Sequence, residues 1–152
     1  MELSANFTLA AYIKSNTATR LDIDNTPNEK HLESAVKLFK NVIQPVRDKF
    51  GPTRLSSGYR CAQLNTAVGG SKKSQHCKGE AVDFEVYGTD NREVVEWVID
   101  NLDFDQIILE FYDESDMNSG WIHCSYVSDQ YNRNNVLRAV KENGRTKYLK
   151  GL

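Results

Sequence analysis

The chain has 152 residues with a formal net charge of −2, and 26% of its residues are charged. This length predicts one domain, residues 1–152, that buries a core without the help of disulfide bonds. A charge so close to zero argues against a nucleic-acid partner bound by a broad basic face, and no apolar run approaches the roughly 20 residues that cross a bilayer. Residues 1–7 lack the basic start and apolar centre of a secretory signal, which predicts a protein made in the cytoplasm.

The N-terminal region predicts one short helix and a loop before a second helix begins. Residues 7–13 are rich in apolar side chains and favour a helix, whereas residues 15–25 are polar and contain turn formers. Thr26, Pro27 and Glu29 then resemble a capping box. Thr26 would be the N-cap, Pro27 the first helical residue, and Glu29 would reach back to the cap.

A long amphipathic helix is predicted to follow. Its apolar residues recur at steps of three and four, which is the helical period; they are Leu32, Val36, Phe39, Ile43, Val46 and Phe50. Gly51-Pro52 should end this helix, and Pro45 inside it should kink the helix or split it in two. His31, near its start, is expected to be solvent-exposed rather than a ligand.

Strand and helix signals alternate in the middle of the chain. Residues 54–57 favour a short strand and residues 61–68 a small helix. Residues 81–87 alternate in polarity and are rich in β-formers, so they predict a second strand. Asp90 with Glu93 resembles a capping box that opens another helix. The expected apolar face of that helix is Val94, Val95, Trp97, Val98 and Leu102.

The C-terminal third predicts two hairpins. Residues 106–112 and 121–127 are typical of paired strands around an acidic turn. Residues 136–141 and 146–149 flank Asn143-Gly144, and Asn-Gly between alternating runs is a strong hairpin signal. Because helices come first and strands cluster later, we expect an α+β domain with a mostly antiparallel sheet flanked by helices.

The segment from Ser74 to Asp83, together with a histidine further along, suggests a metal site. His76 and Asp83 offer an imidazole and a carboxylate, and Gly79 between them allows a loop to turn into a strand. His123 would be a third ligand. Two histidines and one aspartate leave zinc a fourth, open position, which is the arrangement of a catalytic site rather than a structural one. A histidine and an aspartate at this spacing are common by chance, so the pattern alone is weak.

The three cysteines are Cys61, Cys77 and Cys124. An odd number does not form a closed disulfide framework, and we expect small, reduced and buried side chains. Direct zinc ligation by Cys77 or Cys124 is the alternative.

The string Ser74-x-His76-x-x-Gly79-x-Ala81-x-Asp83, with Trp121-Ile122-His123, closely resembles the zinc D-alanyl-D-alanine carboxypeptidase family. That family includes D-Ala-D-Ala dipeptidases and phage endolysin peptidases and shares its fold with the Hedgehog signalling domain. Further segments resemble its phage-type branch: Phe7-Thr8, Asn25-Thr26-Pro27, Ser56-Ser57-Gly58-Tyr59-Arg60, Leu64-Asn65, Val68-Gly69-Gly70 and Gln106-Ile107-Ile108-Leu109-Glu110. The resemblance covers nearly the whole chain and implies this fold, a Zn²⁺ cofactor and a peptide substrate.

The resemblance also implies roles for individual residues. His76, Asp83 and His123 would be the metal ligands. Arg60 matches the arginine that pairs with the substrate carboxylate or with the developing oxyanion, which suits its fixed, permanently charged donor fork. Ser74 would either hydrogen-bond near the zinc and contact substrate or shape the loop.

The general base is where this sequence departs from the family. Many members have an acidic residue three positions before the last histidine ligand, and here that position is Gly120. Glu110, at the end of the preceding predicted strand, is our expected base because a hairpin would bring it beside that histidine. Asp113, Glu114 and Asp116 in the turn are the rivals.

The function implied is hydrolysis of peptide bonds involving D-amino acids in peptidoglycan, by a carboxypeptidase or an endopeptidase. The phage-type resemblance implies an endolysin or virion protein that reaches the cell wall after release. One alternative is a non-catalytic, zinc-stabilised virion or binding module, which Gly120 favours. Another is a cytoplasmic dipeptidase that acts on free D-Ala-D-Ala.

Overall fold

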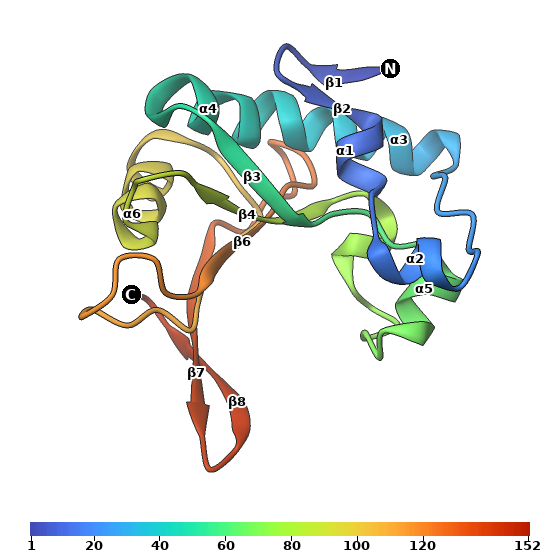
Figure 1. The fold of residues 1–152 in the computed structure, drawn as a ribbon. Helices are drawn as coiled ribbons and strands as arrows, with labels where there is room; N and C mark the ends of the chain where they lie inside the picture. The colour runs from blue at the N-terminus through green and yellow to red at the C-terminus, as the bar shows by residue number, and fades with distance from the viewer.

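The computed structural model describes residues 1–152, and a twisted sheet of six strands dominates it (Figure 1). The strand order is β3 (Thr53–Ser57), β4 (Ala81–Val86), β6 (Trp121–Ser125), β5 (Gln106–Glu110), β7 (Asn135–Glu142) and β8 (Arg145–Lys150). Every neighbouring pair is antiparallel except β5–β7, which is parallel. A separate small hairpin joins β1 (Glu2–Ser4) to β2 (Phe7–Thr8). The mostly antiparallel α+β fold predicted from the sequence is confirmed.

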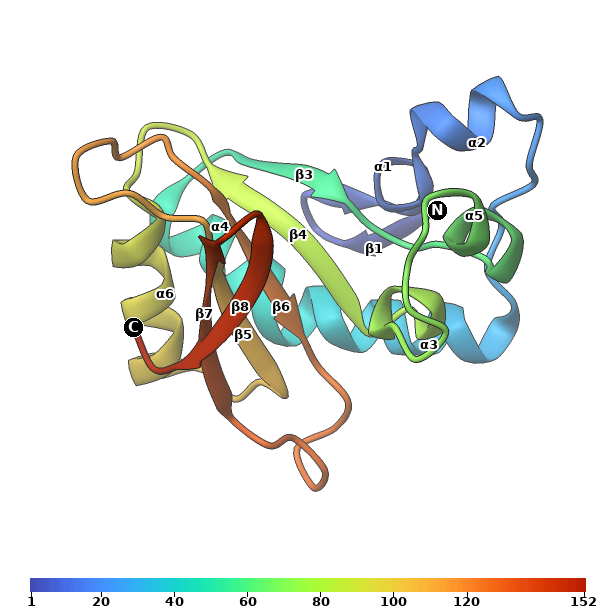
Figure 2. The ribbon, with the colours of Figure 1, turned by 90° about the horizontal axis from the view of Figure 1, so that it is seen from below.

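The helices complete the architecture. They are α1 (Leu9–Ile13), α2 (Asn16–Arg20), α3 (Glu29–Leu38), the π-helix η1 (Phe39–Ile43), α4 (Gln44–Phe50), α5 (Ala62–Ala67), the 3₁₀-helix η2 (Gln75–Lys78) and α6 (Asn91–Asn101). The continuous rod α3–η1–α4 runs across the back of β4 and β6, and α6 lies beside its end (Figure 2). None of these helices combines the length and the hydrophobicity that crossing a membrane requires.

Apolar and polar residues alternate along the strands, so the sheet has one apolar face and one polar face. Alternate residues of the central strands, such as Phe84, Leu109 and Ile122, are buried in one core cluster with the apolar residues of α3, η1, α4 and α6. Successive strand residues point to opposite faces. The residues between them, including Asp83 and His123, therefore face away from the helices. The helices cover and stabilise the apolar face of the sheet. The polar face, which carries Asp83 and His123, is left uncovered by them.

The N-terminal prediction was partly wrong. Residues 7–13 do not form one helix, because Phe7–Thr8 pair as β2 and only Leu9–Ile13 are helical. Residues 15–25, predicted as a loop, contain α2, whose N-cap Ser15 accepts a hydrogen bond from the Ala18 N–H. Side-chain caps of this kind satisfy N–H groups that a short helix cannot pair internally, and they explain why five residues suffice here.

The long predicted helix is confirmed, with two local differences. Its N-cap is Asn28 rather than Thr26, because the Asn28 side chain accepts a 2.8 Å hydrogen bond from the His31 N–H. Pro45 interrupts the rod as expected, through the π-helix η1 that immediately precedes α4. Proline has no N–H to donate to the preceding turn, and a wider turn absorbs the missing bond.

His31 was predicted to be solvent-exposed, and this was wrong. The residue is half-buried, and its Nδ1 lies 2.8 Å from the hydroxyl of Tyr59, which is itself 5% exposed. The contact joins residues 28 positions apart, so no local sequence pattern predicts it.

The later predictions are confirmed to within a few residues. Asp90 caps α6 by accepting from the Arg92 N–H. Asn143 and Gly144 form the turn between β7 and β8 with φ of 53° and 76°, the left-handed values that favour this dipeptide in hairpins.

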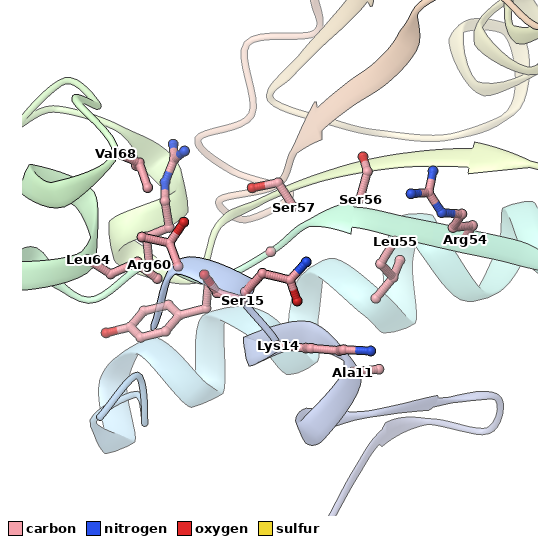
Figure 3. Close-up of a pocket in the computed structure, with 14 residues that line it drawn as sticks. Ala11, Lys14, Ser15, Arg54, Leu55, Ser56, Ser57, Arg60, Leu64 and Val68 are labelled. Atoms are coloured by element: carbon pink, nitrogen blue, oxygen red, sulfur yellow. The ribbon is translucent and has the colours of Figure 1, made fainter. Parts of the chain in front are cut away.

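A hollow of about 450 Å³ lies along β3, an edge strand of the sheet (Figure 3). Residues of α1, the α1–α2 connection and β3 line it, including Lys14, Arg54 and Ser57. Arg60 lines its inner end and also lines a larger cleft on the polar face of the sheet.

Candidate active site

The loop that carries His76 is built by a cap and a glycine. The Ser74 hydroxyl caps η2 by accepting from the His76 N–H at 3.2 Å, which sets the direction of the histidine. Gly79 ends η2 in the left-handed conformation, with φ of 73°. A Cβ at Gly79 would lie 2.2 Å from the backbone oxygen of His31. Glycine therefore allows the chain to turn against α3 and enter β4.

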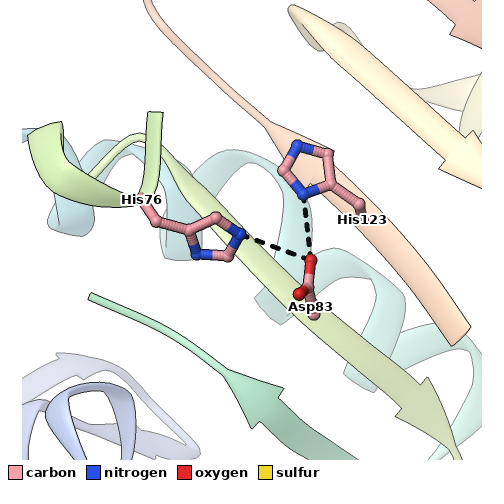
Figure 4. A group of neighbouring side chains, drawn as sticks. All are labelled: His76, Asp83 and His123. Carbon is pink, nitrogen blue, oxygen red and sulfur yellow. Dashed lines mark hydrogen bonds and ion pairs between the residues drawn. The ribbon is translucent and has the colours of Figure 1, made fainter. Parts of the chain in front are cut away.

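Three ligand-type side chains converge at the end of this loop. Asp83 on β4 is directly opposite His123 on β6 in the sheet register, so both side chains leave the same face. The Nδ1 of His123 lies 2.9 Å from Asp83 Oδ1, and the Nε2 of His76 lies 3.4 Å from the same oxygen (Figure 4). One ligand atom from each residue lies within 4.8 Å of the others.

The contacts of His76 fit a metal ligand. Its Nδ1 lies 2.7 Å from the carbonyl oxygen of Gly58, which can only accept, so Nδ1 carries the proton. When the ring carries no second proton, the lone pair of Nε2 points at the carboxylate of Asp83. Two acceptors that face each other at 3.4 Å need a proton or a metal ion between them. The His–carbonyl bond is also the partner that fixes ligating histidines in metal sites.

The charge of Asp83 suits the same role. Burial raises the pKa of this carboxyl, but the adjacent imidazoles of His123 and His76 outweigh burial and hold the pKa well below its ordinary range. Asp83 is therefore ionised at neutral pH, the form that binds zinc.

None of the cysteines joins the cluster. Cys124 is fully buried in the core on the helix side of the sheet, and Cys61 caps α5 with its sulfur. Cys77 is half-buried, and burial raises the pKa of its thiol. The prediction of buried cysteines is confirmed for Cys124 only, because Cys61 and Cys77 are half-buried. The alternative of zinc ligation by Cys77 or Cys124 has no support in this geometry.

Glu110 lies beside the cluster, at the end of β5. Ile108 is opposite His123 and Glu110 is opposite Trp121, so Glu110 and His123 share the polar face one pair apart. Only 8% of Glu110 is exposed. The pKa of Glu110 is raised to about 7, mainly by burial. The neighbouring His123 lowers this pKa and the charge of Asp83 raises it. A carboxyl with a pKa near neutrality can both accept and return a proton.

The acids of the β5–β6 turn lie apart from the cluster. Asp113 accepts from Ser115, and Glu114 pairs with Arg92 at 3.4 Å while remaining 84% exposed. Asp116 is exposed and accepts from the Asn118 N–H. None of the three lines the cleft that holds the ligand cluster and Glu110.

A family model described as peptidase M15 matches residues 5–125. The chain belongs to the peptidase M15 family. This confirms the resemblance to zinc D-alanyl-D-alanine carboxypeptidases at the family level, and it identifies the chain as a metallopeptidase. Peptidases of the M15 family depend on zinc, and the matched residues include the three cluster residues and Glu110. The comparison with curated proteins found no match.

Gly120 departs from the common M15 pattern for a steric reason. Its φ is +65°, and a Cβ there would lie 1.8 Å from the carbonyl oxygen of Glu110. The β6 strand thus enters the sheet directly against the end of β5. A side chain at position 120 would therefore clash with the backbone of Glu110 in this structure.

Replacement of Gly120 by alanine should therefore damage both stability and the site. We expect Gly120→Ala to destabilise the fold by about 1–3 kcal/mol beyond the cost of its positive φ, and to lower activity by moving Glu110. Gly144→Ala is the matched control, because Gly144 has φ of +76° with nothing within 4 Å. Thermal or urea unfolding of both variants tests this. Equal losses of stability would contradict the proposed clash.

Arg60 and Ser74 lie together at one side of the cleft. The Arg60 guanidinium donates to the Ser74 hydroxyl at 3.2 Å, and the Arg60 N–H donates to the carbonyl of His76. The Nε of Arg60 is buried without a partner. Because Arg60 also lines the cleft, its permanently charged guanidinium can bind an anionic group there.

The cleft itself contains residues that sequence analysis missed. Its volume is about 740 Å³. Besides the predicted site residues it is lined by Ser71, Lys73, Gln75, Gln106, Ile108, Phe111, Trp121, Arg133, Leu137, Thr146 and Tyr148. Gln75 donates to the buried carboxylate of Asp105 at 2.9 Å, which ties η2 to the start of β5. Strand order and register determine these neighbours. Gln106, Ile108 and Trp121 lie in the motif segments quoted above, but the motifs assigned them no role in the site.

Proposed function

We propose that this chain is a zinc-dependent peptidase that hydrolyses peptide bonds involving D-amino acids in the stem peptide of peptidoglycan. The observation that supports it is the convergence of His76, Asp83 and His123 beside a buried carboxylate with a raised pKa. Membership of the M15 family supports the peptidase activity, and the motif resemblance described above supports the substrate.

In this proposal His76 Nε2, one carboxylate oxygen of Asp83 and His123 Nδ1 hold the metal. The donor set of two neutral imidazoles and one ionised carboxylate matches the catalytic type of zinc site. Zinc, when bound, supplies a Lewis acid that polarises the scissile carbonyl and lowers the pKa of water to about 7. Gly58 keeps His76 in the correct tautomer through its carbonyl oxygen.

The remaining steps belong to Glu110 and Arg60. Glu110 accepts a proton from the attacking water and returns it to the leaving amine, which its raised pKa permits. Arg60 donates to the oxyanion that develops on the scissile carbonyl. Ser74 accepts from the guanidinium and keeps it aimed into the cleft.

The deciding experiment combines metal analysis with product identification. The purified chain is loaded with zinc, its metal content is measured, and it is incubated with cell-wall sacculi and, separately, with free D-Ala-D-Ala. We expect one zinc ion per chain and new muropeptides or released D-Ala from sacculi. Cleavage of the free dipeptide alone would make it a dipeptidase. Stoichiometric zinc without cleavage of either substrate would overturn the peptidase and favour a binding module.

We also propose that the protein meets the cell wall after release or as part of a virion, which the phage-type motifs support. The binding-module alternative drew its support from the missing acid at position 120. The steric conflict between a side chain at Gly120 and the backbone of Glu110 gives a structural reason for glycine at this position, so the missing acid no longer favours the binding module.

A further inference from the structure

The hairpin β7–β8 extends the sheet beyond β5 and lies outside the residues that the M15 family model matches. It forms the edge of the sheet opposite to β3, and Figure 1 shows it projecting below the rest of the molecule. Three of its residues, Leu137, Thr146 and Tyr148, nevertheless line the cleft that contains the metal cluster. The family resemblance cannot assign roles to these residues, so their positions must be considered on their own.

Tyr148 lies in the same cross-strand row as Glu110. Trp121 on β6 is opposite Glu110 on β5, Glu110 is opposite Ala139 on β7, and Ala139 is opposite Tyr148 on β8. Residues opposite each other on neighbouring strands project from the same face of a sheet. All four side chains therefore leave the face that carries Asp83 and His123.

The residue between Glu110 and Tyr148 leaves space for contact. Ala139 has only a methyl group and is 1% exposed, so the phenol of Tyr148 has no larger side chain between it and Glu110 within the row. Burial and the charges of Glu110 and Asp83 raise the pKa of Tyr148. The phenol is thus a hydrogen-bond donor at neutral pH, and with 56% of the residue exposed a substrate can reach it.

We propose that Tyr148 contacts the substrate, and that its hydroxyl donates a hydrogen bond to the half of the peptide that leaves as the amine. This inference rests on the proposed peptidase function. Glu110 returns its proton to the leaving amine, so that half of the substrate lies beside Glu110, and Tyr148 is the exposed donor in the same row. Arg60 follows β3 at the opposite edge of the sheet and is placed for the carbonyl side.

The test uses Tyr148→Phe, which removes only the hydroxyl, on the full zinc-loaded chain. We expect a KM about 5- to 10-fold higher and equally weaker inhibition by the amine product, the usual effect of one neutral hydrogen bond. Inhibition by the carboxyl product and the zinc content should be unchanged. Tyr131→Phe is the matched control, because Tyr131 is 69% exposed and does not line the cleft.

The pattern of inhibition separates contact from a general structural effect. If the variant were inhibited equally more weakly by the amine product and by the carboxyl product, or if neither inhibition changed, the role of Tyr148 would be overturned. If the wild-type protein cleaves nothing, the peptidase proposal fails, and calorimetry with an intact stem peptide then decides about Tyr148. Weaker binding to Tyr148→Phe than to wild type would support the contact, whereas equal affinity, or no binding to wild type, would overturn it.

Discussion

His76→Ala is expected to abolish both metal binding and peptidase activity. His76 contributes one of only three ligand-type side chains in the cluster, and its removal leaves Asp83 and His123 as a pair. Loss of a partner that only orients a ligand already costs about 10- to 100-fold in metal affinity, and loss of the ligand itself should cost more. Elemental analysis after dialysis and a cell-wall digestion assay measure the two effects.

His31→Ala is the control for this variant. His31, on α3, contacts the hydroxyl of Tyr59 and is outside the cluster, so its removal should leave one zinc ion bound per chain. A His76→Ala protein that keeps both stoichiometric zinc and full turnover would show that the metal centre is elsewhere.

Glu110→Gln should retain the metal and lose most of the turnover. Glutamine preserves the shape of the side chain but cannot accept a proton, and general acid–base catalysis contributes about 10²- to 10⁴-fold to rate. We expect a fall of that size in kcat. Glu114→Gln, a change at the exposed turn acid that pairs with Arg92, should be neutral. If Glu110→Gln turned over at the wild-type rate, one of the turn acids would be the base.

The pH dependence of both proteins provides a second measurement. Glu110 must be ionised to accept a proton, so wild-type kcat/KM should rise with pH along a limb at or below about 7, since a bound cation lowers the pKa of a neighbouring carboxyl. Glu110→Gln should lack this limb.

The stability of the metal-free protein should show the opposite dependence. The pKa of Glu110 is raised from 4.5 in the unfolded chain to about 7 in the fold. The folded state therefore binds the proton more tightly, and stability is lost as pH rises through this window. Metal-free Glu110→Gln should melt above the wild type at pH 8 and close to it at pH 4, as thermal unfolding can establish. A lower melting temperature at pH 8 would contradict the raised pKa.

Local sequence signals predicted most of the fold. Apolar residues at helical spacing marked α3 to α4, Pro45 marked its interruption, and Asn143-Gly144 marked the last hairpin. These signals succeed because each depends on residues close in the chain. The failures at His31 and in the segment of α2 arose where contacts between distant residues or a single capping side chain decided the structure.

The residues of the candidate site could likewise be predicted where a local motif or a hairpin identifies them. The histidines and aspartate were recognised by their motif and lie together, and Glu110 could be expected beside them because β5 and β6 are consecutive strands that pair as a hairpin. Tyr148 could not be expected, because its place depends on the parallel pairing of β5 with β7. A crossover of this kind joins strands that no local turn connects.

The carboxylate of Asp105 has a consequence for where the domain ends. It is 2% exposed, accepts from Gln75 beside the metal loop, and receives two hydrogen bonds from the Arg133 guanidinium. Removing one partner of a buried charge pair leaves the other uncompensated, which is strongly destabilising. Shortening the chain after β6 would remove Arg133 and leave this buried anion without its charged partner. The segment that follows β6 therefore supports the loop that carries His76, through Asp105 and Gln75, although it lies beyond the residues that the family model matches.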